Sequence, residues 1–140
     1  MHCVQGTRGA ELAAGLNRDR ITNIFQKGTD AGIDSYSGLF DNGHHKSTGM
    51  GEWLKAQRVT EVFVCGLATD YCVKFTALDA AKMAFKTHLI ADASRGVNLL
   101  PDDAKNAIEE MKLWHASSTA RHLVGRRRAH PLHRGQSGKL

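Results

Sequence analysis

The sequence has few cysteines and lacks a long apolar run. Its three cysteines, Cys3, Cys65 and Cys72, are an odd number and include no CxxC pair, so a disulfide framework is not expected. No stretch resembles a membrane span or a secretory signal peptide. We therefore expect a reduced, soluble, cytoplasmic protein that has no membrane partner.

The chain also lacks an internal repeat and a glycine-rich phosphate loop. With 140 residues and 41% apolar content, it is long enough to bury one core, and a second domain is not expected. We predict a domain over residues 1–124 and a basic, disordered tail over residues 125–140.

Basic charge is concentrated at the C-terminal end. Six of the 19 lysines and arginines lie in the last 20 residues, which contain no acid; this leaves 13 basic residues against 14 acidic residues in the first 120. The basicity therefore belongs to the tail. Because the tail has no interleaved aromatic side chains on which bases could stack, we expect no nucleic-acid partner.

Apolar spacing and turn residues predict alternating helices and strands. Helices are expected over residues 11–16, 50–58, 70–84 and 101–113, and strands over residues 22–27, 61–65 and 87–91. Whether residues 116–124 contain a last strand is left open, because that segment is polar for a central strand. This alternation predicts an α/β fold with a parallel sheet and right-handed crossovers.

Cys72 follows the strand 61–65 and lies at the start of the next helix. The unpaired N–H groups and the positive dipole end of a helix favour a thiolate over a thiol. Ligands of open α/β sheets bind at this edge, just past the carboxyl ends of the strands. Cys72 is therefore a candidate nucleophile; the alternative is a buried thiol that serves packing.

Lys27 closes the strand 22–27, so a parallel sheet places it at the same carboxyl edge as Cys72. A cation at that edge can stabilise a thiolate and the oxyanion of a reacting carbonyl. The alternative is a solvated lysine at a strand end.

Several motifs together resemble one family. The stretch GLATDYCV at 66–73, followed by TALDA at 76–80, closely resembles the nicotinamidase/pyrazinamidase family of isochorismatase-like cysteine hydrolases. The same resemblance is carried by HCVQGTRGAE at 2–11, FQKG at 25–28, DSYSGLFDNG at 34–43 and SRGV at 94–97, so it covers residues 2 to about 112. It implies a three-layer α/β/α fold with a parallel, Rossmann-like sheet.

The resemblance implies hydrolysis of a small amide, nicotinamide or pyrazinamide, to the acid and ammonia, as in NAD salvage. Cys72 would attack the amide carbonyl to form an acyl-enzyme, and Lys27 would stabilise the thiolate. The backbone N–H groups of Ala68 and Cys72 would form the oxyanion hole, beside a cis bond between Leu67 and Ala68. Leu67, Ala68 and Tyr71 would contact the substrate.

The resemblance further implies a site for one divalent ion, zinc, manganese or iron, and His2 matches one of its ligands. The family's catalytic aspartate and its other ligands precede the position matched by Met1, so we expect a fragment without the first strands. With one ligand of four, the chain should bind metal poorly. Without the aspartate its activity should be impaired, and the isolated chain should fold poorly or need a partner, including a homo-oligomer.

Other polar and sulfur-containing residues are given structural roles. We expect Cys3 and Cys65 to be packing residues and His44 and His45 to lie at the surface. Asp70 is expected to support the loop at the start of its helix rather than to act as a catalytic acid.

Two further functional hypotheses stay open. The first is a non-catalytic remnant or interaction protein with the same fold. The second is an isochorismatase-like hydrolase of another substrate, such as isochorismate or a carbamoyl compound.

Overall fold

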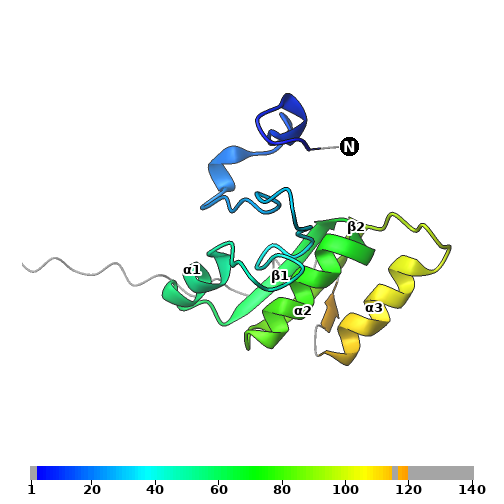
Figure 1. Cartoon of the computed structure of the whole chain (residues 1–140). Coiled ribbons are helices and arrows are strands. Elements are labelled where there is room, and N and C mark those ends of the chain that lie inside the picture. Colours follow the sequence, from blue (N-terminus) through cyan, green and yellow to red (C-terminus); the bar gives the residue numbers. More distant parts are fainter. Residues whose placement is uncertain (1–2, 115–116, 120–140) are drawn as a thin grey trace, which may run out of the picture.

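A computed structural model of the chain describes residues 3–114 and 117–119. The order of elements is η1 (Arg8–Ala10), η2 (Arg18–Arg20), α1 (Met50–Ala56), β1 (Glu61–Leu67), η3 (Thr69–Val73), α2 (Lys74–Lys82), β2 (Lys86–Arg95), α3 (Asp103–Leu113) and β3 (Ser117–Thr119). The N-terminal segment, residues 3–27 and drawn in blue shades in Figure 1, lies mostly apart from the sheet and its helices. The functional residues are therefore positioned mainly by the part that follows.

The described strands form one parallel sheet in the order β1-β2-β3. The register between β1 and β2 shifts between Val64 and Gly66, where Gly66 adopts a φ of 122° that favours glycine. The predicted parallel sheet is confirmed, and both β1 and β2 are longer than expected. The strand left open within residues 116–124 is present as the short β3.

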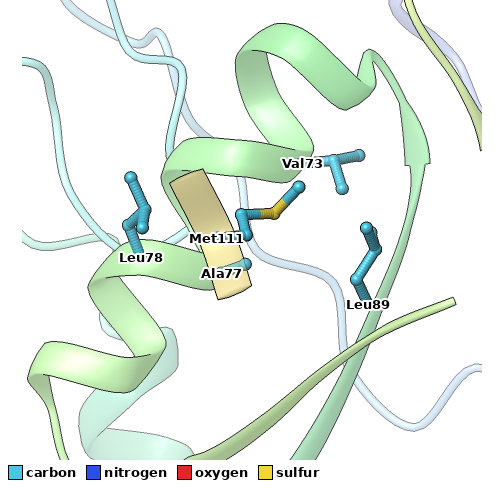
Figure 2. Packing of buried hydrophobic residues seen from close by; sticks show 5 residues of the cluster. All are labelled: Val73, Ala77, Leu78, Leu89 and Met111. Atoms are coloured by element: carbon cyan, nitrogen blue, oxygen red, sulfur yellow. The ribbon is translucent and has the colours of Figure 1, made fainter. Parts of the chain in front are cut away.

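The main core lies between α2, α3 and the sheet, as Figure 2 shows. Ala77 and Met111 are completely buried, and they pack with Val73 and Leu78 against Leu89 of β2. The small side chain of Ala77 on α2 allows this close approach. The core therefore fixes the start of α2, where Cys72 lies, against the sheet.

A second cluster connects α1 to the far end of α2. Leu39, Ala80 and Phe85 are buried there, and Met50 and Leu54 of α1 pack against them. The predicted helix at 50–58 is confirmed, with Gly49 at its N-cap position. The α/β class is thus confirmed, and both clusters draw on the face of β1 that bears Val62 and Val64.

Two predicted elements in the N-terminal segment are wrong. Residues 22–27 form no strand, because no strand among the described residues pairs with them. Residues 11–16 form no helix; a helix that short needs packing, and Leu16 is 48% exposed. Short 3-10 turns, η1 and η2, lie on either side of that segment instead.

Within the described residues, no helix has the length and apolar character needed to cross a membrane. The predicted tail, residues 125–140, lies outside the described residues.

Candidate active site

Cys72 lies in η3, a π-helical turn between β1 and α2. Thr69, Asp70 and Val73 of this turn are buried, while Cys72 is half-buried. The carbonyl oxygen of Ala68 accepts hydrogen bonds from the backbone amides of Tyr71 (3.1 Å) and Val73 (3.0 Å). The expected place of Cys72, in the first helical turn after β1, is confirmed.

Lys27 reaches the sulfur of Cys72 from a segment 45 residues earlier in the sequence. Its Nζ lies 3.5 Å from Cys72 Sγ and donates a hydrogen bond of 2.6 Å to the carbonyl oxygen of Ser35. Although residues 22–27 form no strand, Phe25 packs against Trp53 of α1, with ring centroids 5.7 Å apart. This contact helps to hold Lys27 in place without strand pairing.

Aromatic side chains lie on the same turn as Cys72 and on the loop that follows Lys27. Tyr36 meets Tyr71 edge-on at 5.5 Å and stacks on Phe75 at 5.6 Å between ring centroids. Tyr71 and Phe75 are four residues apart, a spacing that places side chains on one helix face. Tyr36 and Phe75 were not among the expected site residues. The spacing of Phe75 from Tyr71 indicates a shared helix face, but it does not reveal the contact with Tyr36.

The junction of β1 and η3 has the expected cis peptide bond between Leu67 and Ala68. Leu67 is 75% exposed at the end of β1, and Ala68 is half-buried. Leu67 and Ala68 therefore lie directly before the turn that contains Tyr71 and Cys72.

Asp70 fastens this turn to the loop after β2. Its carboxylate accepts hydrogen bonds from the backbone amides of Val97 (3.0 Å) and Asn98 (2.8 Å). Burial alone raises the pKa of this carboxyl, but the hydrogen bonds from Val97, Asn98 and its own amide, together with the charge of Lys74, hold the pKa of Asp70 below its ordinary value. The expected supporting role of Asp70 agrees with this geometry.

The lowered pKa predicts a pH dependence of stability. A group whose folded pKa is depressed stabilises the fold above its ordinary pKa, about 4, and this contribution is lost as the pH falls through the folded pKa. We expect Asp70→Asn to flatten the acid side of the curve of unfolding free energy against pH, measured by urea titration. Glu109→Gln, on the exposed side of α3, serves as the control, and an unchanged acid slope in Asp70→Asn would contradict this assignment.

The sequence matches the Isochorismatase domain family over residues 1–121. The chain belongs to the isochorismatase family. The resemblance seen in its motifs is thereby confirmed.

Individual relatives agree with this membership. The nicotinamidase of Escherichia coli (strain K12) is 46% identical over 110 residues, which cover 79% of this chain and 52% of the relative. A solved nicotinamidase/pyrazinamidase of Acinetobacter baumannii has a TM-score of 0.84 at 38% identity, covering 89% of this chain and 59% of that one. A solved pyrazinamidase of Pyrococcus horikoshii in complex with zinc has a TM-score of 0.72 at 38% identity, covering 86% of this chain and 62% of that one.

These comparisons confirm the isochorismatase-like fold. They also show that the chain spans about half the length of the curated relative and about 60% of the solved structures.

No metal-binding group is found in the described part of this isochorismatase-family chain, where no three His, Cys, Asp or Glu side chains could hold an ion together. His2, the predicted ligand, lies outside the described residues. His44 and His45 are exposed, as expected, and His44 Nε2 lies 3.3 Å from Asp79 Oδ1. The described residues therefore do not fit the implied metal, and we derive no reaction step through it.

The packing role expected for two cysteines is wrong. Cys3 and Cys65 are both exposed. Cys3 lies in the N-terminal segment outside the core, and Cys65 alternates with Val64, which packs on the helix-covered face of β1. Of the three thiols, Cys72 has the lysine contact.

Proposed function

We propose that the site around Cys72 hydrolyses the carboxamide of nicotinamide to nicotinate and ammonia, the reaction that serves NAD salvage. The observation that carries this proposal is the 3.5 Å approach of Lys27 Nζ to Cys72 Sγ at the end of β1. The activity named for relatives such as the Escherichia coli nicotinamidase supports the same chemistry.

In the proposed first step, the sulfur of Cys72 attacks the carbonyl carbon, a C–S bond forms, and the carbonyl electron pair moves onto oxygen. The backbone N–H groups of Ala68 and Cys72 would stabilise this oxyanion. The thiol proton passes to solvent water. The C–N bond then breaks, and the nitrogen takes up a proton from water and leaves as ammonia. Water hydrolyses the resulting thioester, which releases nicotinate and restores the thiol.

The remaining residues would bind and orient the substrate. Leu67, Ala68 and Tyr71 would contact the substrate, and Tyr36 and Phe75 extend the aromatic cluster that includes Tyr71. A flat pyridine ring suits such a surface because aromatic rings pack by stacking and edge-on contacts. The ammonium group of Lys27 would favour the thiolate before attack.

We further propose that these 140 residues catalyse the reaction slowly. Among the described residues, no carboxylate forms an ion pair with Lys27, so none of these carboxylates lies beside the lysine to take the thiol proton. A well-placed general base is usually worth about 100- to 10,000-fold in rate.

The test is release of ammonia from nicotinamide by the whole chain, with zinc, manganese or iron added in separate reactions. We expect slow release that disappears in Cys72→Ala. If neither protein released ammonia, the proposal would be overturned and a non-catalytic remnant would be favoured. Release of pyruvate from isochorismate, or of ammonia from a carbamoyl compound, with no ammonia from nicotinamide or pyrazinamide, would assign a different substrate.

A further inference from the structure

We infer that Thr76 is a positioning residue that holds Lys27 and Cys72 in register, an inference that rests on the proposed role of Cys72 as nucleophile. Thr76 lies one helical turn after Cys72. Its hydroxyl donates a hydrogen bond of 2.6 Å to the carbonyl oxygen of Cys72 and accepts one of 2.8 Å from the backbone amide of Gly38. A single hydroxyl thus connects the nucleophile's turn to a loop far away in sequence.

A threonine hydroxyl inside a helix commonly donates to the carbonyl four residues earlier, so the bond to Cys72 alone would be ordinary. The acceptance from Gly38 is what distinguishes Thr76. Thr48 donates to the carbonyl oxygen of the same glycine at 2.7 Å. Gly38 is therefore held through both its amide and its carbonyl.

The loop held in this way also positions Lys27. The carbonyl oxygen of Ser35, three residues before Gly38, accepts the 2.6 Å hydrogen bond from Lys27 Nζ. Thr76 therefore acts on both members of the pair: directly on the backbone of Cys72, and through Gly38 and Ser35 on the ammonium group of Lys27.

Gly38 lies directly against both α1 and α2. A Cβ at this position would lie 2.8 Å from Cε of Met50, the end of a flexible side chain of α1, and at the ordinary contact distance of 3.5 Å from Oγ1 of Thr76 in α2. The loop backbone is thus close enough to α2 for the hydrogen bond that Gly38 donates to the hydroxyl.

Lys27 needs such support because it is exposed and its segment has no strand partner among the described residues. The effect of an ammonium group on a nearby thiolate weakens as their distance and hydration increase. If the loop loosens, the ammonium group spends less time near the sulfur, and the sulfur reacts more slowly as a nucleophile.

The test compares Thr76→Val, which keeps the shape but removes the hydroxyl, with Thr76→Ser, which keeps it. We measure alkylation of Cys72 by iodoacetamide at neutral pH, resolved by peptide mass spectrometry, with exposed Cys65 as the internal reference. We expect Thr76→Val to lower the alkylation rate of Cys72 by about three- to tenfold. In Thr76→Ser, Cys72 should be alkylated at nearly the wild-type rate. A hydroxyl that only stabilises the helix would leave the rate unchanged or raise it by exposing the thiol; either result would overturn the inference.

A double-mutant cycle with Lys27→Met identifies the route of the effect. We expect Thr76→Val to slow the alkylation of Cys72 less in the Lys27→Met background than in the wild type, because only its direct action on the Cys72 backbone then remains. Equal slowing in both backgrounds would refute action through Lys27. No amide substrate enters these assays. Slowed alkylation without ammonia release would thus refute the proposed hydrolysis alone, and ammonia release with unchanged alkylation would refute the positioning role alone.

Discussion

Lys27→Met slows the alkylation of Cys72 at neutral pH by about tenfold, because it removes the ammonium group that lies 3.5 Å from the sulfur. Methionine retains most of the length of the lysine side chain, so the change mainly removes charge and a hydrogen-bond donor. The rate is measured with iodoacetamide and peptide mass spectrometry, and Cys65 in the same sample reports any general change in reactivity.

Lys46→Met is the matched control for this prediction. Lys46 is exposed, as Lys27 is, and its Nζ donates a hydrogen bond of 3.2 Å to Thr29 Oγ1. Lys46→Met removes the same net charge as Lys27→Met but leaves the lysine beside Cys72 in place. The alkylation rate of Cys72 should therefore stay within about twofold of wild type. Equal slowing by the two variants would assign the effect to overall charge rather than to the lysine beside the sulfur.

Met111→Ala lowers the free energy of unfolding by about 3 kcal/mol, as expected for a large-to-small change in a core. Met111 is completely buried between α3, α2 and Leu89 of β2 (Figure 2). Because whole domains are stable by only about 5–15 kcal/mol, this change should move the urea midpoint markedly. It should also expose η3, since Val73 belongs to the same cluster.

Leu113→Ala is the control from the same helix. Leu113 is 80% exposed, so its truncation should change the unfolding free energy by less than about 0.5 kcal/mol. The midpoints come from far-ultraviolet circular dichroism in urea. A similar small loss for both variants would mean that α3 does not pack on the sheet as described.

The elements around the site could be predicted because local signals and packing agree there. The strand expected over residues 61–65 and the helices expected over 70–84 and 101–113 all correspond to elements of the structure. Residues 22–27 could not be predicted in the same way. Their apolar and β-branched composition favours a strand, but strand formation also depends on a hydrogen-bonded neighbour, which local sequence does not reveal.

The pairing of Lys27 with Cys72 followed from the rule that ligand sites gather at the carboxyl ends of parallel strands. It occurs even though the segment of Lys27 is not a strand, because Phe25 and the carbonyl of Ser35 hold the lysine instead. The contributions of Tyr36, Phe75 and Thr76 depend on how the loop 34–43 folds over α2. Such long-range contacts leave no periodic pattern in the sequence.

The most direct test of the account is to look for its covalent intermediate. The whole chain is incubated with nicotinamide, quenched in acid, digested and analysed by mass spectrometry, with Cys72→Ala treated in parallel. We predict a nicotinoyl thioester on the peptide that contains Cys72 and none on those of Cys3 or Cys65. A Cys72 that alkylates readily in the same preparation but never carries the nicotinoyl group would contradict its role as the nucleophile.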